Sequence, residues 1–471
     1  MIGRTSEIEE LQRLYDSKES EFVAVYGRRR VGKTYLVKET FEGRFAFLHT
    51  GLANIETRSQ ILHFFKSLKA FGYTERRCPR NWFEAFDALE ALLRKSQMKR
   101  KVVFIDELPW MDTSRSDFIT ALGSFWNEWA SARKDVLFII CGSASSWIIK
   151  KIFRNRGGLH NRVTARIALR PFTLRECELF ARDRELGMTR KDIAECYMAL
   201  GGIPYYWKAL QRGKSLAQNL DMMFFDEMAP LKDEFNDLYS SLFKNAAGYK
   251  KIVEVLATRK IGMSRSEIAE LTGIHGTGRL SDMLDTLVAS GFLRWYRGYG
   301  KKKRDGIYQL IDNFTLFHFR FLAPPPTDEH FWSATLASQT QSVWRGLAFE
   351  RLCLQHLAQI RRALGVGSIH VEAYGWQFKG NETYPDGVQI DMILERADNV
   401  INICELKYSA NPFAIDKSYD AELGRKAATF AGVTGTKKAL HLTLVTANGL
   451  VKNQYSSRVQ SQVVLDDLFD A

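Results

Sequence analysis

The sequence predicts an α/β protein built from several domains. The chain has 471 residues, which is too long for one compact core and favours about three domains. Short apolar runs alternate with amphipathic helical stretches in the first 165 residues, as expected for a three-layer domain with a largely parallel sheet. Strands and helices return near the C-terminus, after three consecutive prolines. We therefore expect an α/β domain at each end and smaller modules between them.

A phosphate-binding loop is predicted near the N-terminus. Residues 27–34 read GRRRVGKT and lie between the apolar run 22–26 and the helix-like stretch YLVKETF. A strand, G-x-x-x-x-G-K-T and a helix in this order are the context of a P-loop. Its glycines let backbone amides curl around phosphates, and the helix start favours an anion. Lys33 would reach the β- and γ-phosphates, and the Thr34 hydroxyl would contact Mg²⁺. The nucleotide-binding residues expected are Gly27, Arg28, Arg29, Arg30, Val31, Gly32, Lys33 and Thr34.

Two later strands supply the other groups that ATP hydrolysis needs. Residues 101–107, KVVFIDE, predict a hydrophobic strand that ends in two carboxylates. Asp106 suits a second contact to Mg²⁺, and Glu107 suits polarising the attacking water. Another apolar run, 135–143, ends in Ser143, a candidate sensor of the γ-phosphate. The expected cofactors are ATP and Mg²⁺, and ATP hydrolysis is one expected activity.

These motifs resemble the AAA+ superfamily, specifically its archaeal and prokaryotic ATPase branch related to the STAND NTPases. The opening IGRTSEIEELQRL is similar to a motif that precedes the first helix in that family. GGIPYYW, at 201–207, resembles the Gly-x-Pro segment of its helical lid, which lies near the nucleotide in the family. The resemblance implies an AAA+ P-loop core at 1–165 and a helical lid at 166–240, where strand-like runs are lacking.

The same resemblance implies a basic residue after the sensor strand. Arg162, in GGLHNRV, stands at that place and would contact the γ-phosphate, either within its own subunit or from a neighbour. Arg154 and Arg156 are nearby alternatives for this contact, and the alternative role for Arg162 is that of a surface or phosphate-steering arginine. Contact from a neighbour would make the protein a homo-oligomer.

Residues 246–312 predict a small nucleic-acid-binding module. YKKIVEVLATR is a first helix, Ser264 to Glu267 form a capping box before a second, and Thr277 caps a third that ends near Gly291. Two strands then flank the run KKKR. Three helices and a basic hairpin resemble a winged helix-turn-helix.

The charges of this module favour phosphate contact over base reading. Arg279 starts the third helix, but Asp282 and Asp285 on the same helix disfavour its insertion into a groove. The alternative is a structural winged helix used as a spacer or as a protein contact. The wing would carry the basic residues Lys301, Lys302, Lys303 and Arg304.

A stiff linker separates this module from the last domain. APPPTDEH breaks any helix and should form an extended joint within residues 323–334. The domain at 335–471 then runs helix, strand, hairpin, helix, strand. The last helix carries Lys417, Arg425 and Lys426, which contact either the phosphate backbone or only solvent.

The hairpin of the last domain brings two carboxylates together. In QIDMILERADNVINICELKY, residues 397–399 suit a three-residue loop. Counting back along both strands then places Ile393 opposite Ile403 and Asp391 opposite Glu405. Opposed carboxylates repel each other, and a divalent cation bound to their oxygens removes that cost.

This pattern resembles the PD-(D/E)XK nuclease superfamily and therefore a restriction-endonuclease-like α/β fold. The resemblance implies that Asp391 and Glu405 bind Mg²⁺ and that Lys407, two residues beyond Glu405 on the same face, positions water or phosphate. It also implies a helix carboxylate, for which Glu350 is the candidate. Asp386 is an alternative to Asp391. The supporting glutamine of the superfamily has no clear match, which leaves orientation of the water open; an ordinary hairpin or an inactive nuclease-like fold is the alternative.

Bulk properties limit the partners and the location. A net charge of +13 and a pI of about 9.3 favour a polyanionic partner such as nucleic acid, but establish only non-specific attraction. Six scattered cysteines without Cys-x-x-Cys indicate buried thiols in a reducing compartment. No apolar run is long enough to span a membrane, and early acidic residues argue against a signal peptide. We expect a cytoplasmic protein without a membrane partner.

Together these features predict an ATP-regulated, Mg²⁺-dependent DNA endonuclease. The first alternative is a STAND-like switch whose nuclease-like domain binds DNA or a partner without cutting. A DNA-binding regulator built on the winged helix is weaker, because it leaves both phosphate-chemistry sites without a role.

Overall fold

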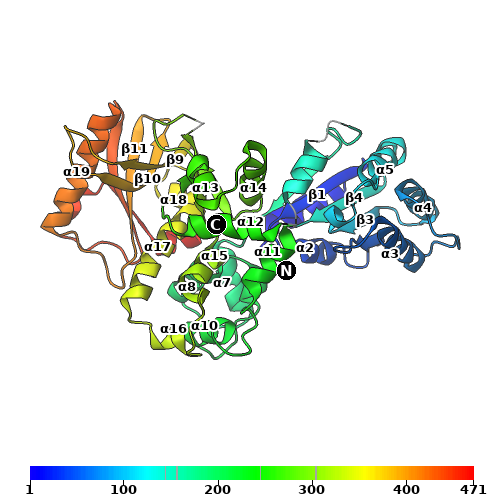
Figure 1. The fold of residues 1–471 in the computed structure, drawn as a ribbon, viewed down its shortest axis with the longest axis horizontal. Helices are drawn as coiled ribbons and strands as arrows, with labels where there is room; N and C mark the ends of the chain where they lie inside the picture. Colours follow the sequence, from blue (N-terminus) through cyan, green and yellow to red (C-terminus); the bar gives the residue numbers. More distant parts are fainter. Residues whose placement is uncertain (144, 155–156, 244, 303–304, 471) are drawn as a thin grey trace. The chain divides into compact units, whose positions relative to one another are not determined.

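The computed structural model describes residues 1–143, 145–154, 157–243, 245–302 and 305–470 (Figure 1). The chain divides into two compact units. The first contains Met1–Pro171 with Ala289–Gly291, and the second contains Phe172–Val288 with Phe292–Ala471. The predicted lid, winged helix and C-terminal domain therefore pack into one unit, although the sequence suggested separate domains.

The first unit is built on a parallel sheet of order β2-β3-β4-β1-β5. All residues of β3 and β4 are buried, as expected for central strands covered on both faces. The predicted boundary at residue 165 is wrong by a few residues, because residues 165–169 form a strand that pairs with the strand leading into the GRRRVGKT loop. The strands are β1 (Glu21–Gly27), β2 (Phe45–Thr50), β3 (Lys101–Asp106), β4 (Val136–Gly142) and β5 (Ala165–Leu169).

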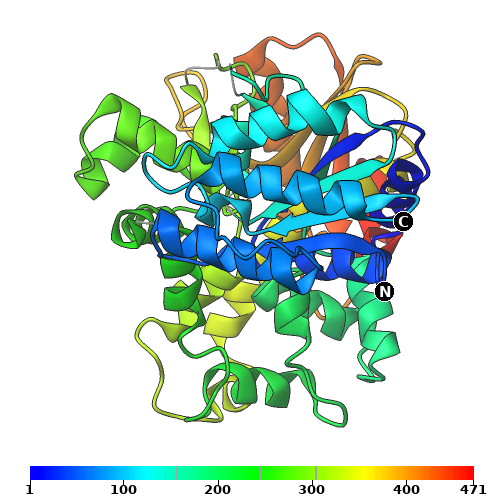
Figure 2. The ribbon, with the colours of Figure 1, turned by 90° about the vertical axis from the view of Figure 1, so that its right-hand side faces the viewer.

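Helices cover this sheet and bury an aromatic core. Figure 2 shows α3, α4 and α5 side by side in blue to cyan. Phe47, Phe64 and Trp82 pack between these helices and the sheet, with the rings of Phe64 and Trp82 5.6 Å apart. The helices are α1 (Thr5–Tyr15), α2 (Lys33–Thr40), α3 (Thr57–Ala70), α4 (Trp82–Lys95) and α5 (Phe118–Ser124).

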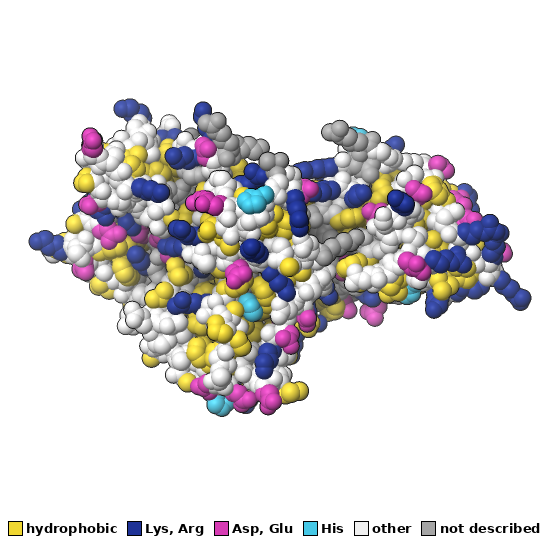
Figure 3. All heavy atoms as spheres, viewed as in Figure 1, with side chains coloured by type: hydrophobic (Ala, Val, Ile, Leu, Met, Phe, Trp, Pro, Cys, Tyr) yellow, Lys and Arg dark blue, Asp and Glu magenta, His cyan; other side chains and the backbone are white. Residues whose placement is uncertain are grey.

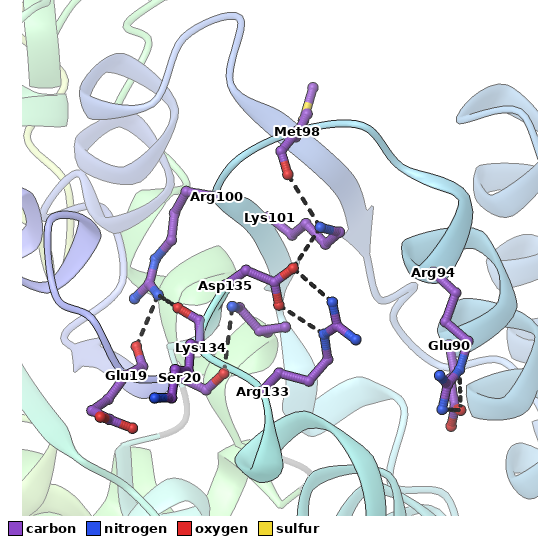
Figure 4. A network of polar contacts seen from close by, with 11 residues as sticks. Glu19, Ser20, Glu90, Arg94, Met98, Arg100, Lys101, Arg133, Lys134 and Asp135 are labelled. Carbon is purple, nitrogen blue, oxygen red and sulfur yellow. Dashed lines mark hydrogen bonds and ion pairs between the residues drawn. The ribbon is translucent and has the colours of Figure 1, made fainter.

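A polar network fixes the amino ends of the strands (Figure 4). Asp135 accepts hydrogen bonds from Lys101 Nζ at 2.6 Å and from Arg133 Nε at 2.7 Å. These cations, Arg133 first, hold the pKa of Asp135 below its usual range. Arg100 donates to the carbonyl oxygens of Glu19 and Lys134 at 2.8 and 2.9 Å. The network ties the beginnings of three strands together and leaves their carboxyl ends for function.

The second unit begins with the helices of the predicted lid. Thr173, Thr189 and Ser215 each form a complete capping box at a helix start. Gly202 lies against residue 172, where an added Cβ would be 1.9 Å from the Phe172 carbonyl oxygen. The helices are α7 (Leu174–Asp183), α8 (Arg190–Leu200), α9 (Pro204–Trp207), α10 (Leu216–Phe224) and α11 (Glu234–Leu242).

A three-helix module follows at the predicted place. The capping box from Ser264 to Glu267 is confirmed, with the Ser264 hydroxyl accepting from the Glu267 amide. The side chain of Thr277 and the basic residues Lys303 and Arg304 lie outside the described part of the chain. The elements are α12 (Ala246–Ala257), β6 (Met263–Ser264), α13 (Arg265–Thr272), α14 (Thr277–Ala289), β7 (Leu293–Tyr296) and β8 (Ile307–Leu310), with sheet order β6-β8-β7.

Part of the predicted linker is packed helix. Residues 331–334 form α16 (Phe331–Ala334), and the Trp332 side chain is buried. The Asp221 carboxylate on α10 accepts from the Trp332 amide at 2.8 Å. The linker prediction is therefore wrong for this stretch, because the aromatic residues after the prolines are anchored within the unit. The chain reaches them through α15 (Asn313–Phe317) and a π-helical turn, His318–Leu322.

The C-terminal part contains a mixed sheet of order β13-β12-β11-β10-β9. β9, β10 and β11 are antiparallel, whereas β11, β12 and β13 are parallel. The predicted order of elements is present, and β13 is an addition. The elements are α17 (Gln339–Gln355), α18 (Leu357–Ala363), β9 (Val371–Phe378), β10 (Val388–Arg396), β11 (Val400–Lys407), α19 (Lys417–Thr434), β12 (Ala439–Thr446) and β13 (Ser461–Val464).

The lid helices contact the C-terminal elements directly. The Tyr408 hydroxyl, just after β11, donates to Glu195 on α8 at 2.6 Å. Glu195 also lies 3.4 Å from Arg345 on α17. His356 Nε2 accepts from the Leu174 amide at 3.1 Å, and burial lowers the pKa of His356 to about 4, which keeps the ring neutral. These contacts connect the lid to the C-terminal part by packing as well as through the proline segment.

The fold shows where the cysteines lie and how long and apolar the helices are. Five of the six cysteines are buried, and Cys78 is partly exposed. Within the described ranges, every helix is too short or too polar to cross a lipid bilayer.

Candidate functional sites

The GRRRVGKT loop connects β1 to α2 as predicted. Gly27 ends β1 with a φ of 149°, and a Cβ there would lie 2.2 Å from the Leu169 carbonyl oxygen. Gly32 precedes α2 in the left-handed region, with a φ of 91°. Both positions require glycine: Gly27 because β5 approaches it closely, and Gly32 because the chain turns sharply into the helix.

The polar groups expected at the nucleotide lie together on this loop and on β3. The Thr34 hydroxyl donates to Asp106 Oδ2 at 2.7 Å, so both expected Mg²⁺ contacts are neighbours. Lys33 Nζ donates to the carbonyl oxygens of Gly27 and Arg28 at 3.0 and 2.8 Å. A hydroxyl and a carboxylate side by side form an oxygen donor set that suits Mg²⁺.

The ends of β3 and β4 place Glu107 beside Ser143. The Ser143 hydroxyl donates to the two Glu107 carboxylate oxygens at 3.0 and 3.2 Å. Glu107 has a positive φ of 47°, a strained conformation typical of functional sites. Ser143 therefore orients Glu107, a role that the sequence did not suggest.

The remaining expected residues differ in exposure. Val31 and Arg28 are buried, whereas Arg29 and Arg30 are half-buried. Arg4, from the opening motif, is buried and donates to the Val31 carbonyl oxygen at 3.3 Å, which supports the loop from behind.

The arginines after the sensor strand lie at the surface where they can be described. Arg162 and Arg154 are exposed. Arg156 lies outside the described residues. A contact from Arg162 to phosphate stays a prediction, and its exposure leaves contact with a neighbouring subunit open.

The register of the C-terminal hairpin is confirmed. Ile393 pairs with Ile403 and Met392 with Cys404, which brings Asp391 level with Glu405. A β-bulge against β9 falls between Ile390 and Ile393. Asp391 Oδ2 accepts from the Leu406 amide at 3.1 Å, so the carboxylate is held against β11. Bulges commonly re-aim a side chain beside a site.

Glu405 is the most deeply buried carboxylate of this group. Its side chain is 1% exposed, and Oε2 accepts from Lys426 Nζ at 2.8 Å and from the Tyr419 hydroxyl at 3.2 Å. Oε1 is buried and has no hydrogen-bond partner. Burial, and then the charge of Asp391, raise the pKa of Glu405. The sequence predicts that the basic face of α19 contacts phosphate or solvent. Lys426 of that face instead forms a buried ion pair with Glu405.

Lys407 and Glu350 complete the predicted set. Lys407 Nζ lies 3.9 Å from Glu405 Oε2 and 4.8 Å from the centre of the Tyr419 ring. Glu350, on α17, has its pKa raised to about 7, by burial first and then by the charge of Asp391. Asp386 is exposed in the turn before β10, which favours Asp391 as the site residue.

Lys260 also belongs to this site, although no sequence pattern indicates it. Its Nζ lies 2.7 Å from Glu350 Oε2 and 3.3 Å from Asp391 Oδ1. Lys260 stands well over a hundred positions before the hairpin, in a different predicted domain, so neither spacing nor periodicity could connect it to the carboxylates.

The donor set fits a divalent cation in part. Three carboxylates supply hard oxygen ligands, and the unpartnered Oε1 of Glu405 is a buried acceptor that a cation would satisfy. Ammonium groups nevertheless contact all three carboxylates in this structure. Among the described residues, acidic, His and Cys side chains form no group of three already arranged for a metal ion.

Comparison with known proteins finds an ATPase domain family that matches the N-terminal part of the chain. Residues 1–210 match the family of ATPase domains found predominantly in Archaea. An uncharacterized protein of Methanocaldococcus jannaschii is 23% identical over 385 residues, 81% of this chain and 82% of the relative.

Two solved structures match this chain over most of their own length. The Walker-type ATPase of Pyrococcus abyssi is 16% identical with a TM-score of 0.46, over 68% of this chain and 96% of that one. The ORC2 protein of Aeropyrum pernix, in ADPNP–ADP complexes, is 16% identical with a TM-score of 0.40, over 71% and 95% of the two chains. The family match and the loop geometry together support a P-loop ATPase domain that binds and hydrolyses ATP.

Proposed function

We propose that the protein is an ATP-regulated, Mg²⁺-dependent DNA endonuclease. The ATPase half rests on the domain match at residues 1–210 and on the loop described above. The nuclease half rests chiefly on one observation. A buried, unpartnered oxygen of Glu405 lies level with Asp391 on a hairpin that also carries Lys407.

Mg²⁺ at the carboxylate site would polarise a phosphodiester oxygen and supply a nucleophilic water at neutral pH. Asp391 and Glu405 would hold it, with Glu350 beside them. Lys407 would hold the water or the phosphate. Glu350, with a pKa of about 7, is suited to accept a proton from the attacking water near neutral pH.

In the ATPase domain, each side chain has a distinct part. Thr34 and Asp106 would bind Mg²⁺ with the nucleotide, and Lys33 would leave the loop carbonyls for the β- and γ-phosphates. Glu107 would orient the attacking water, and its hydrogen bonds to Ser143 hold the carboxylate in place.

DNA is the proposed substrate because of charge and the three-helix module. The net charge of +13 favours a polyanion. Figure 3 shows Lys and Arg dispersed among Asp and Glu on the visible face. The module with β7 and β8 resembles a winged helix, and the exposed Lys302, Lys417 and Arg425 are candidate phosphate contacts. Homo-oligomer formation through Arg162 belongs to this proposal.

Nucleotide binding at the ATPase domain would affect the nuclease site through the lid. Glu195 on α8 contacts both Tyr408, which follows β11, and Arg345, which shares α17 with Glu350. A shift of α8 would therefore move both elements that carry the carboxylates. This route runs through side-chain contacts within the second unit and does not require the proline segment.

A STAND-like switch without cleavage is the second candidate. Lys260 and Lys426 neutralise the carboxylates, and this observation favours a domain that binds DNA or a partner. Nucleotide-dependent assembly without cleavage would be its signature.

Plasmid nicking tests the proposal. Wild type, Lys33→Ala and Glu405→Ala are compared with Mg²⁺ or Mn²⁺, with and without ATP. Glu382→Ala is the matched control, because Glu382 is an exposed glutamate of the same domain. We expect Glu405→Ala to abolish cleavage, Lys33→Ala to change its response to ATP, and Glu382→Ala to behave as wild type. Cleavage that survives Glu405→Ala, or no cleavage by folded wild type that hydrolyses ATP, contradicts the nuclease half.

A further inference from the structure

Lys260 bridges two parts of the second unit. It belongs to the segment between α12 and β6 of the three-helix module, yet its ammonium lies on the carboxylates of the C-terminal part. Nζ is 2.7 Å from Glu350 Oε2 and 3.3 Å from Asp391 Oδ1. One cation thus contacts the proposed metal ligand Asp391 and the neighbouring Glu350, and the other proposed ligand, Glu405, lies level with Asp391.

The backbone that carries Lys260 is held in place by its own module. Gln309 on β8 donates to the Lys260 carbonyl oxygen, and the Tyr296 hydroxyl donates to the Ile261 carbonyl oxygen at 2.7 Å. Gly262 follows with a φ of 93°, and a Cβ there would lie 2.2 Å from the Tyr308 carbonyl oxygen. The position of the ammonium is therefore set by the module rather than by a loose surface loop.

The electrostatic balance of the site depends on this lysine. Glu350 and Asp391 repel each other, and burial disfavours the charged form of Glu350. The Lys260 ammonium contacts both carboxylates and supplies positive charge at the place where a divalent cation would bring it.

A cavity beside the ion pair gives the ammonium room to move. The cavity is about 530 Å³. Glu350, Asp391 and Lys260 line it together with Gln377 and Gln389, whose side chains can accept hydrogen bonds. A displaced Lys260 side chain could therefore remain solvated and hydrogen-bonded inside the unit.

We propose that Lys260 is a built-in counter-ion that pairs with Glu350 and competes with the divalent cation for Asp391, so that the three-helix module controls metal loading. The inference rests on the proposed metal site. Contact of nucleic acid with the module would withdraw the segment around Lys260, and the carboxylates would then bind metal. The ammonium keeps the site inactive until the substrate-binding module moves.

Mn²⁺ binding to the full chain without nucleotide tests this inference. Titration calorimetry compares wild type, Lys260→Gln, and the matched control Lys251→Gln, an exposed lysine on α12. Binding that disappears in Glu405→Gln is assigned to the carboxylate site. We expect Lys260→Gln to tighten this binding about tenfold or more, the effect that one charge within 4–6 Å has on a proton affinity. Lys251→Gln should leave it unchanged.

The wild-type chain provides a second measurement if Lys260→Gln does not fold. Amine labelling read by mass spectrometry should show Lys260 protected without metal and several-fold more reactive at saturating Mn²⁺. Lys251 should react equally in both conditions.

The outcomes separate this inference from the proposed function. Glu405-dependent binding of equal affinity in wild type and Lys260→Gln, or unchanged labelling of Lys260 while Mn²⁺ binds, overturns the counter-ion and leaves the metal site standing. Absence of Glu405-dependent binding in every folded form removes the metal site, and the counter-ion with it.

Discussion

The nucleotide loop and the carboxylate site place similar chemistry on different kinds of scaffold. The loop takes most of its groups from one stretch, residues 27–34, and adds Asp106 from a strand of the same sheet. The carboxylate site draws on α17, on the β10–β11 hairpin and on Lys260 of another module. A contiguous site is defined by local backbone geometry, whereas an assembled site depends on how modules pack and can be opened or closed by that packing.

The largest effect that tests this contrast is expected at Lys33. Lys33→Ala should reduce ATP hydrolysis about 10²-fold or more, because the group aimed at the transferred phosphate is lost. Phosphate release at saturating ATP measures it. Lys38→Ala, an exposed lysine on the same helix, should hydrolyse ATP at the wild-type rate. Equal loss in both variants would mean that α2 tolerates no change of charge, and that Lys33 has no special part.

The backbone of the loop should be nearly as intolerant. Gly27→Ala should lower the free energy of unfolding by about 2–5 kcal/mol, since positive φ and a clash with the Leu169 carbonyl both oppose it. Gly43→Ala is the control, because Gly43 also has a positive φ but no atom within 4 Å of the added Cβ. Urea unfolding measures the loss of stability in both variants, and the difference between the two losses is the part due to the clash. Similar midpoints would contradict the close approach of β5.

The carboxylate site should instead respond to pH. The pKa of Glu350 is raised to about 7 in the folded chain from 4.5, so the folded state binds its proton more tightly. The contribution of Glu350 to the free energy of unfolding is complete below pH 4.5. It is lost as pH rises through 7, which lowers the free energy of unfolding by roughly 1–3 kcal/mol.

Urea unfolding between pH 5 and 8 measures this slope. Glu350→Gln should flatten it, and Glu382→Gln should not. A wild-type slope that persists in Glu350→Gln would assign the titration to another group.

The smallest effect concerns the contact between the lid and the hairpin. Tyr408→Phe removes a 2.6 Å hydrogen bond to Glu195 and should cost about 1–2 kcal/mol, because the acceptor is charged. It should also weaken the dependence of cleavage on ATP. A double-mutant cycle with Glu195→Gln gives the interaction energy directly. Strict additivity of the two substitutions would show that Tyr408 and Glu195 are not coupled.

The ATPase core and the hairpin register could be predicted from the sequence because both follow local rules. The loop GRRRVGKT needs only a strand before it and a helix after it. The pairing of Ile393 with Ile403 follows from a three-residue turn and the two-residue period of a strand. The same two-residue period places Asp391 level with Glu405 and requires no long-range contact.

The domain boundaries were less predictable because they depend on packing. β5 belongs to the first sheet only through its pairing with β1. Trp332 makes part of the linker helical and buried because Asp221 and aromatic side chains of the same unit hold it. Neither partner is close in sequence, so composition alone suggested a free joint.

The sequence by itself determined the phosphate loop, the acidic strand ends and the opposed carboxylates, since each depends on residues within a turn or a strand pair. Only the tertiary structure decided which cations meet those carboxylates. Lys426 could be placed on a helix face but not against Glu405, and Lys260 could not be placed at all. A charge acts through space over several ångströms, whereas sequence patterns report only neighbours along the chain.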